Sequence, residues 1–300
     1  MLLLNRIKKC IPIIIVVIPL LFSIKLNPTE ADFKTKENSK AVALDPFNSE
    51  FNSISLGVYE MYMRSIIYNL EQAGYTVDYY KDENVTINLL KKLDDEGYRV
   101  VYINSHGFVD SRGYFILFIN EKIDSEKMNL YQDDIREGRI GYLEVGSLAG
   151  YLYVTPHFFL FYGKDYLFSG ALIFIDACYS GNNTSLADVF LSLGAQCFIG
   201  WNGPVNVIHG IMMDGKFFHE ARRYNKTVEQ ALWGTRADPD SGAALTYFGN
   251  GSLRILRTTP ISEEDGTLID VTLKIVIASA ILASTIYVFR RIFLSKKYRR

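Results

Sequence analysis

The stretch from Ala171 to Gly181 reads ALIFIDACYSG. It is a continuous apolar run, preceded by Gly170, that ends abruptly in an acid, a thiol and a glycine. A short run of this kind predicts a buried central strand of a parallel sheet. Ligands of open α/β sheets bind beyond the carboxyl ends of such strands. Asp176 and Cys178 lie at that end, so Cys178 is either a nucleophile or a small buried residue.

The segment before this strand alternates between strand and helix signals. Apolar runs and apolar residues at helical spacing predict the order strand, helix, strand, helix, strand at residues 41–44, 56–72, 76–80, 86–93 and 98–104. Such alternation is typical of an α/β protein, and right-handed crossovers make its sheet parallel. The third strand is followed by Ser105, His106 and Gly107, so a histidine also lies at a carboxyl strand end.

The remaining parts of the domain are predicted in different detail. Residues 114–123 predict a small hairpin, residues 124–140 are charged and expected to be exposed, and the aromatic-rich residues 141–163 receive no element. Further helices are predicted at residues 185–193, 208–224 and 227–235, a strand at 195–199, and a last strand or hairpin at 245–256. Thr227 and Gln230 form a capping box. The predicted fold class is α/β, with a mostly parallel sheet flanked by helices.

Both ends of the chain carry the signals of a membrane protein. Residues 1–25 have a basic start and an apolar run, which predicts either a cleaved signal peptide or an uncleaved anchor. Residues 268–289 are long and apolar enough for a transmembrane helix, and the basic residues of 290–300 follow them. Because basic residues stay on the cytoplasmic side, this single C-terminal span places the domain at residues 41–257 outside the cytoplasm. The connecting residues 26–40 and 258–267 are predicted linkers.

Charge is unevenly distributed along the chain. Its 32 Lys and Arg and 33 Asp and Glu give a formal net charge of −1. The two ends hold 11 of the basic residues and one of the acids, which leaves 21 basic against 32 acidic residues, about −11, in the middle. An acidic body argues against nucleic acid as a partner. It suits a basic substrate, or simply a soluble extracellular domain.

His106 and Cys178 are the residue types that acyl transfer requires. A cysteine nucleophile needs a nearby base or imidazolium that makes thiolate available. Neighbouring strands lie about 4.8 Å apart, so side chains just beyond their ends can converge on one substrate carbonyl. The backbone N–H groups of Gly107 and Cys178 are the candidate oxyanion donors. The helix after Cys178 is expected to direct its positive end toward a thiolate.

Other residues of the same types fit this chemistry less well. Cys197 lies inside an apolar strand and is expected in the core. His157 lies in an aromatic run and His219 on a helix, whereas His209 follows a loop that contains glycine and proline and could line the cleft. No cluster of histidine and cysteine has the spacing of a metal site, and no phosphate-binding loop signature is present. The sequence therefore predicts no metal and no cofactor.

The segments SHG at 105–107 and DACYSG at 176–181 together resemble the caspase-like cysteine peptidases. This group includes caspases, metacaspases, legumain, clostripain and gingipains, in which a histidine and a cysteine form a dyad with no obligatory third acid. The resemblance covers roughly residues 41–256. Residues 191–201 and 227–232 are similar to the gingipain-like and CHAT-type branches. The resemblance to the caspase-like group implies a caspase-like fold and peptidase activity.

The resemblance also implies a role for Asp176. In metacaspase-like and clostripain-like members, an acid two residues before the cysteine lines the pocket for a basic substrate side chain. An Arg or Lys side chain pairs with a carboxylate there, which implies cleavage after Arg or Lys. The alternative is that Asp176 orients its loop or caps backbone groups.

The sequence thus predicts a membrane-tethered cysteine endopeptidase that acts on protein or peptide substrates. In this reading Cys178 attacks the scissile carbonyl, and His106 mainly protonates the leaving amine. The N–H groups of Gly107 and Cys178 hold the oxyanion, and Asp176 selects the basic side chain. Two alternatives stay open: a transamidase similar to the caspase-like subunit that attaches GPI anchors, and a non-catalytic receptor or scaffold that keeps the fold.

Overall fold

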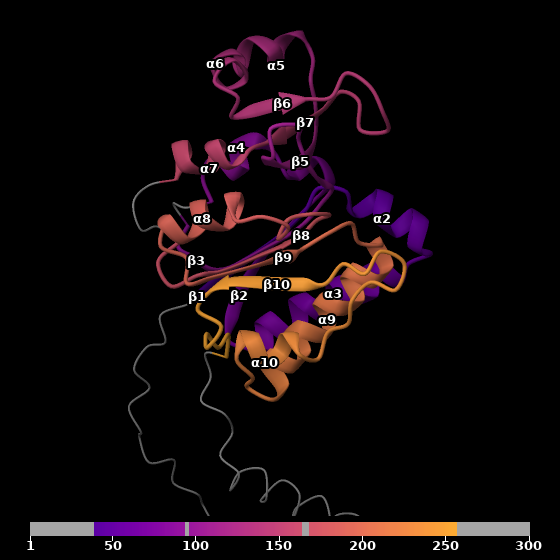
Figure 1. The fold of residues 1–300 in the computed structure, drawn as a ribbon, viewed down its shortest axis with the longest axis vertical. Coiled ribbons are helices and arrows are strands. Elements are labelled where there is room, and N and C mark those ends of the chain that lie inside the picture. The colour runs from indigo at the N-terminus through magenta and orange to yellow at the C-terminus, as the bar shows by residue number, and fades with distance from the viewer. Residues whose placement is uncertain (1–38, 94–95, 164–167, 257–300) are drawn as a thin grey trace, which may run out of the picture. The chain divides into compact units, whose positions relative to one another are not determined.

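The strand predicted within residues 171–181 is β8 (Leu172–Asp176). It lies inside a six-stranded sheet of order β10-β9-β8-β3-β1-β2. The computed structural model describes residues 39–93, 96–163 and 168–256. The other strands of this sheet are β1 (Ser39–Asp45), β2 (Tyr75–Lys81), β3 (Tyr98–Asn104), β9 (Cys197–Trp201) and β10 (Leu245–Gly249). All pair in parallel except β10, which runs antiparallel to β9. The predicted mostly parallel sheet is therefore confirmed (Figure 1).

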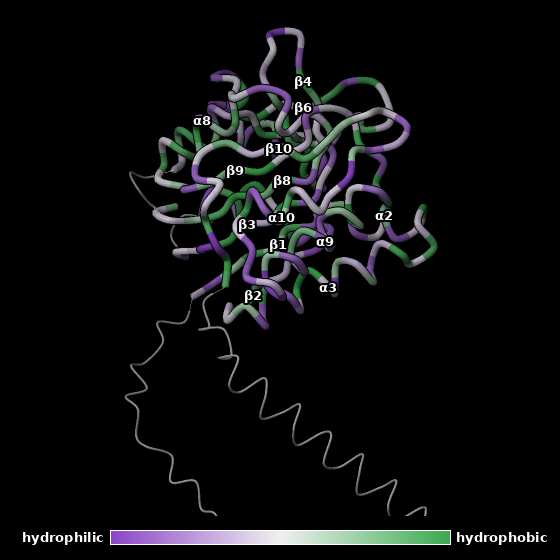
Figure 2. The backbone as a smooth tube through the Cα atoms, turned by 60° about the horizontal axis from the view of Figure 1, so that its bottom comes forward, coloured by the Kyte–Doolittle hydropathy of each residue, from purple (hydrophilic) through white to green (hydrophobic). Residues whose placement is uncertain are grey.

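Alternation along the strands divides their side chains between two faces, and helices cover both. Ile173 and Ile175 of β8 share a core with residues of α4 (Ile87–Leu90), α7 (Pro156–Tyr162) and α8 (Ser185–Ser192). Leu172 and Phe174 share a second core with residues of α3 (Val58–Gln72), α9 (Val207–Arg223) and α10 (Val228–Leu232). Figure 1 shows these two groups of helices on opposite sides of the sheet, and Figure 2 shows the apolar character of the central strands. Burial on both faces explains why β8 is apolar at every position before its terminal acid.

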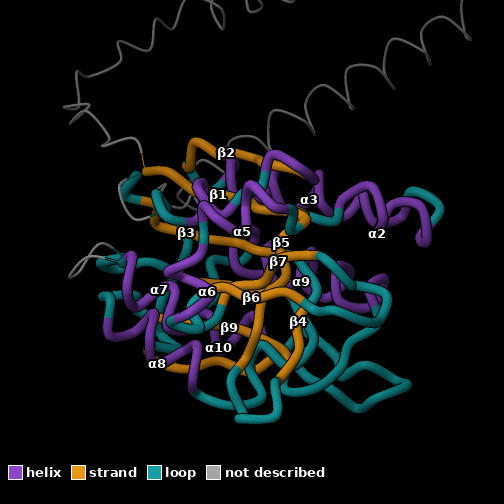
Figure 3. Tube along the Cα trace, turned by 90° about the horizontal axis from the view of Figure 1, so that it is seen from above, coloured by secondary structure: helices purple, strands orange, loops and turns teal. Residues whose placement is uncertain are grey.

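A second sheet, antiparallel and four-stranded, was not expected from the sequence. It has the order β4-β5-β7-β6, with β4 (Gly107–Val109), β5 (Phe115–Lys122), β6 (Ile140–Tyr142) and β7 (Tyr151–Val154). Figure 3 shows these strands grouped together. Helices α5 (Ser125–Leu130) and α6 (Gln132–Arg136) connect β5 to β6. The predicted hairpin at 114–123 is wrong, because these residues form the single strand β5, whose pairing with β7 shifts register between Phe118 and Lys122.

The helix predicted at residues 56–72 is confirmed as α3 (Val58–Gln72), and a separate helix that was not predicted, α2 (Asn48–Ser55), precedes it. Helix α2 ends at Leu56, and α3 begins at Val58. Leu56 and Gly57 have φ angles of 51° and 84°. These left-handed conformations end one helix and prevent it from continuing into the next. The capping box of Thr227 and Gln230 is present at the start of α10, as predicted.

The segments predicted at the two chain ends lie outside the described residues. These are the signal peptide or anchor at 1–25, the linkers up to residue 38 and from 258 to 267, the transmembrane helix at 268–289 and the basic tail at 290–300. Ser39 and Lys40, predicted as linker, belong to β1. Across residues 39–93, 96–163 and 168–256, no helix combines the length and the apolar character that crossing a membrane requires.

Candidate active site

The parallel pairing of β3 with β8 brings the two predicted catalytic segments together. The last register pair of these strands is Asn104 with Asp176, and the Ser105 N–H donates to the Asp176 carbonyl at 2.9 Å. His106 and Cys178 each follow two residues after that pair. A Cβ placed on Gly107 would lie 2.8 Å from the Cys178 carbonyl oxygen and 2.9 Å from the Ala177 Cβ. The backbones of the two segments are therefore in contact at the carboxyl edge of the sheet.

Two residues of the sequence motif after Cys178 serve to build its turn. The Ser180 hydroxyl donates to the Ile175 carbonyl at 2.7 Å and accepts from the Trp201 N–H at 2.9 Å, which ties the turn to β8 and β9. A Cβ on Gly181 would lie 2.7 Å from the Gly200 carbonyl oxygen, so only glycine fits this close approach. The Ser-Gly part of the motif thus fixes the backbone that presents Cys178.

The Cys178 sulfur contacts the loop that precedes α9. The Val205 N–H donates to the sulfur at 3.3 Å, and the Val205 carbonyl oxygen lies 3.6 Å from it, within reach of the thiol proton. Val205 comes immediately before Asn206, the N-cap of α9. The sequence predicted that the helix after Cys178, which is α8, would direct its positive end toward the sulfur. The observed donor is instead Val205, in the loop one residue ahead of the N-cap of α9.

The pKa of the Cys178 thiol is raised above its ordinary value. Burial is the main cause, the hydrogen bond from Val205 acts in the opposite direction, and the charge of Asp176 raises the pKa further. The resting sulfur is therefore a neutral thiol near neutral pH. Attack on a carbonyl requires a base that removes its proton.

His106 is held in place by two aromatic rings and a carboxylate. Its Nε2 lies 3.1 Å from Glu50 Oε1, a distance at which the ring N–H donates to the carboxylate. The imidazole packs edge-on against Phe47 and Phe51, with ring centroids 4.7 and 5.0 Å away. Glu50 was not identified from the sequence, because α2 was not predicted. The four-residue spacing of Phe47 and Phe51 is the helical signal that could have revealed it.

Asp176 is buried in a polar cluster below the catalytic segments. Its residue is 5% exposed, and its Oδ2 accepts from Asn104 Nδ2 at 2.8 Å. A second buried carboxyl group, Asp214 of α9, adjoins it and accepts from the Tyr102 hydroxyl at 2.7 Å. Burial raises the pKa of Asp176 to about 6. Burial, followed by the charge of Asp176, raises the pKa of Asp214 well above the usual range.

These shifts indicate that Asp176 and Asp214 share one proton. Asp214 Oδ1 receives no hydrogen bond from a donor among the described residues, and a proton on this atom would give it Asp176 as its partner. The Trp201 indole also adjoins Asp176 and limits the rise of its pKa. However, Trp201 Nε1 lies outside hydrogen-bond geometry with every acceptor in the described part of the chain. The cluster therefore retains an unused buried donor next to its carboxylate.

No family model matches the chain. A search of curated proteins also found no match. Among solved structures, the crystal structure of protein GSU0716 from Geobacter sulfurreducens is similar to this chain with a TM-score of 0.36 and 11% sequence identity. The match covers 74% of this chain and 98% of that one. A likeness at this level carries no argument about function, which has to come from the site itself.

The other cysteine and histidines occupy different surroundings. Cys197 is fully buried in the core next to α9, and burial raises the pKa of its thiol to about 12, as expected of a packing residue. His209 lies near Asp176, with its ring 5.9 Å from that of Trp201 and its Nε2 3.0 Å from the Arg236 carbonyl oxygen. Within the ranges that the structure describes, no group of three or more His, Cys, Asp or Glu could hold a metal ion.

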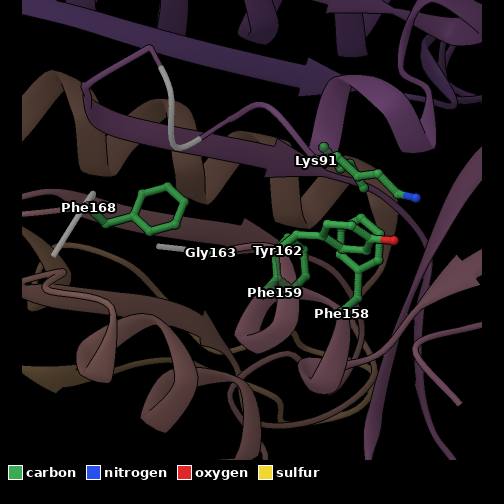
Figure 4. A pocket seen from close by; sticks show the side chains of 7 residues that line it. Lys91, Phe158, Phe159, Tyr162, Gly163 and Phe168 are labelled. Atoms are coloured by element: carbon green, nitrogen blue, oxygen red, sulfur yellow. The ribbon is translucent and has the colours of Figure 1, made fainter. Parts of the chain in front are cut away.

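A cavity beside α7 is lined mainly by aromatic rings (Figure 4). Phe158, Phe159 and Tyr162 of α7 surround it together with Lys91 and Phe168. Its volume is about 10 Å³, room for about one water molecule. The cavity contains none of the candidate catalytic residues and is too small for a peptide side chain.

Proposed function

We propose that this protein is a caspase-like cysteine endopeptidase in which Cys178 is the nucleophile and His106 the acid–base residue. The observation that carries the proposal is the register of β3 and β8. It ends at Asn104 and Asp176, so the imidazole and the thiol each follow two residues later at the same edge. A thiol with a nearby imidazole is the arrangement that nucleophilic catalysis by cysteine requires.

The proposed reaction begins with transfer of the Cys178 proton to His106. The sulfur attacks the scissile carbonyl, and the carbonyl electrons move onto the oxygen. Collapse of this intermediate expels the amine, which takes the proton from His106, and leaves a thioester on Cys178. Water, deprotonated by His106, then hydrolyses the thioester to release the carboxylic acid and restore the thiol. Because the resting thiol is neutral, the base is needed in the first step as well as the acid in the second.

The N–H groups of Gly107 and Cys178 are proposed to stabilise the oxyanion. In the described part of the chain, no carbonyl oxygen accepts a hydrogen bond from the Cys178 N–H. An N–H beside the nucleophile that no carbonyl oxygen uses is what an oxyanion donor needs. Gly107 adjoins the Cys178 backbone so closely that a substrate carbonyl at one segment also approaches the other.

Glu50 is proposed to orient the imidazole. Its carboxylate binds Nε2 of His106, so Nδ1 is the nitrogen left for proton transfer to and from the reacting groups. This third group supports a catalytic triad rather than a bare dyad.

Cleavage after Arg or Lys is proposed from Asp176, with Asp214 as a second carboxyl group. A guanidinium or ammonium that reaches this cluster would replace the shared proton and restore charge balance to a buried acid pair. The Trp201 N–H has no hydrogen-bond partner in the described part of the chain and adjoins Asp176. Gly210 adjoins Asp176 as well, and a Cβ there would lie 3.0 Å from Asp176 Oδ1. Neither residue therefore fills the space beside this carboxyl group with a side chain that pairs with it. The membrane tethers and the extracytoplasmic position of the domain remain proposals from residues 1–25 and 268–300.

Turnover of short peptides tests this function. The full-length protein is offered fluorogenic peptides that end in Arg, Lys, Asn or Asp, alongside Cys178→Ala and His106→Ala variants. We expect cleavage after Arg and Lys by the wild type and loss of at least about 1,000-fold in either variant. Cleavage only after Asn or Asp would refute the role of Asp176, and equal turnover by wild type and Cys178→Ala would refute the enzyme.

A further inference from the structure

The loop of residues 202–206, here called the thiol loop, makes both observed hydrogen-bond contacts to the Cys178 sulfur through Val205. The Val205 N–H donates to the sulfur at 3.3 Å, while its carbonyl oxygen lies 3.6 Å away. The loop also accepts from the Tyr179 N–H through the Gly203 carbonyl oxygen at 2.9 Å. The position of Val205 therefore decides how the sulfur is hydrogen-bonded.

A distant segment clamps the thiol loop on both sides of Val205. Ahead of it, the Ser241 hydroxyl donates to the Pro204 carbonyl oxygen at 2.6 Å. Behind it, the Asn206 N–H donates to Asp238 Oδ2 at 2.7 Å. Both neighbours of Val205 are thus fixed by residues more than thirty positions away in the sequence.

Asp238 is a rigid anchor for this clamp. It is 2% exposed, and its other oxygen accepts from the N–H groups of Asp240 at 2.8 Å and Ser241 at 3.1 Å. Burial alone would raise the pKa of Asp238, but the backbone hydrogen bonds, first that from Asn206, lower it below the ordinary value. The side chain is therefore a carboxylate whose two oxygens both accept backbone hydrogen bonds and hold two loops together.

We propose that Asp238 and Ser241 are positioning residues that fix Val205 so that its N–H stabilises the Cys178 thiolate. The catalytic importance of this contact rests on the proposed function. A hydrogen bond to the charged form of a group favours that form, so loss of the Val205 contact disfavours the thiolate. Without the clamp, the five-residue thiol loop would have only its remaining contacts to hold it against the sulfur.

The charges around Cys178 make the sign of this effect diagnostic. Asp176 acts on the thiol from the end of β8 and Asp238 from the segment behind the thiol loop, while His106 follows β3 at the neighbouring strand end. The negative charge of Asp238 disfavours a thiolate, so removing that charge alone would make Cys178 more reactive. Removing the positioning of Val205 has the opposite effect, and the Val205 hydrogen bond outweighs the charge of Asp238.

The test is the pH dependence of alkylation at Cys178 in the full-length protein. Iodoacetamide is reacted between pH 5 and 10, and modification of the Cys178 peptide is followed by mass spectrometry. For Asp238→Ala we expect an apparent thiol pKa about one unit higher, and so about tenfold slower alkylation at pH 7. Asp240→Ala, which removes an exposed carboxylate two residues away, is the matched control and should titrate like the wild type.

Ser241→Ala provides a milder variant that changes no charge. It removes the hydrogen bond to Pro204 and the one accepted from the Ala243 N–H, and we expect about threefold slower alkylation at pH 7 in a protein that still folds. If Asp238→Ala does not fold, Ser241→Ala decides the question alone. Faster alkylation in Asp238→Ala, or a wild-type profile in folded Ser241→Ala, would overturn the proposal. Because iodoacetamide is not a peptide, a shifted profile without peptide cleavage would keep the clamp and reject the peptidase.

Discussion

Substituting Gly107 by alanine tests the contact between the two catalytic segments. The new Cβ would lie 2.7 Å from Phe115 Cε2, 2.8 Å from the Cys178 carbonyl oxygen and 2.9 Å from the Ala177 Cβ. All three distances are shorter than a carbon atom tolerates. Phe115 is 1% exposed, so its ring has no room to turn away. The backbones of His106 and Cys178 must therefore separate.

The size of the effect follows from the cost of overpacking. Extra atoms in a packed site cost about 1–3 kcal/mol, and in a domain of this size each kcal/mol lowers the melting temperature by about 2–4 °C. A displacement of about 1 Å between reacting groups reduces the rate about 100-fold. We expect Gly107→Ala to melt several degrees lower and to lose about two orders of magnitude in kcat/KM on an Arg-ended peptide.

Thermal unfolding and steady-state turnover are measured side by side on the full-length protein. Gly234→Ala is the control, because its new Cβ would meet its nearest neighbour, the Ala231 carbonyl oxygen, at 3.3 Å and far less crowding results. That variant should differ little from the wild type in both measurements. If Gly107→Ala retains the stability and turnover of the wild type, the two segments do not meet as described.

Three further predictions follow from the site. Glu50→Gln should lower kcat by at most about fivefold, because the Glu50 side chain is 48% exposed and its ion pair with the imidazole is screened. Glu83→Gln, which changes an exposed carboxylate that is not among the contacts of His106, should leave kcat unchanged. Asp214→Asn should raise the melting temperature at pH 8 and lose this advantage near pH 4. The folded carboxyl pair keeps a proton that the unfolded chain releases above the ordinary carboxyl pKa. The free energy of unfolding of the wild type therefore falls as pH rises above that ordinary pKa. A difference in melting temperature between the two proteins that is constant with pH would contradict the shared proton. At pH 8, iodoacetamide should label Cys178 and leave the buried Cys197 intact in the folded protein, as peptide-resolved mass spectrometry would show; equal labelling would contradict the placement of Cys197 in the core.

The large sheet could be predicted because its strands carry their own signals. A largely apolar run such as that of β8 is required wherever helices cover both faces, so residues 41–44, 98–104 and 172–176 were recognisable from composition. The edge strand at residues 76–80 was recognisable from its Thr, Val and Tyr residues. The short strands of the second sheet lack such a run. Ile140–Tyr142 and Gly107–Val109 are three residues long and gain their pairing from tertiary contacts. The predicted hairpin placed its turn at Asn120, where β5 instead continues and its pairing with β7 shifts register.

The site could be predicted only where the chemistry is local to a strand end. His106 and Cys178 each follow a recognisable strand, and parallel pairing then determines that they meet. Glu50 and Val205 act on them from α2 and from the thiol loop, across 56 and 27 residues of sequence. Asp214 lies within the buried face of α9, where the helical pattern shows a polar residue without indicating its partner. Such contacts depend on how the helices and loops pack against one another, and this packing cannot be read from the pattern of a single sequence.

Covalent labelling with a peptidyl-arginine chloromethyl ketone tests the central claim most directly. The reagent alkylates a cysteine fastest when one site holds its basic side chain beside a nucleophilic thiol, and its adduct is identified by peptide mass spectrometry. We predict a single adduct on Cys178 in the full-length protein, slowed strongly in His106→Ala and absent in Cys178→Ala. An adduct elsewhere, or none at Cys178 while the protein is folded, would contradict the account.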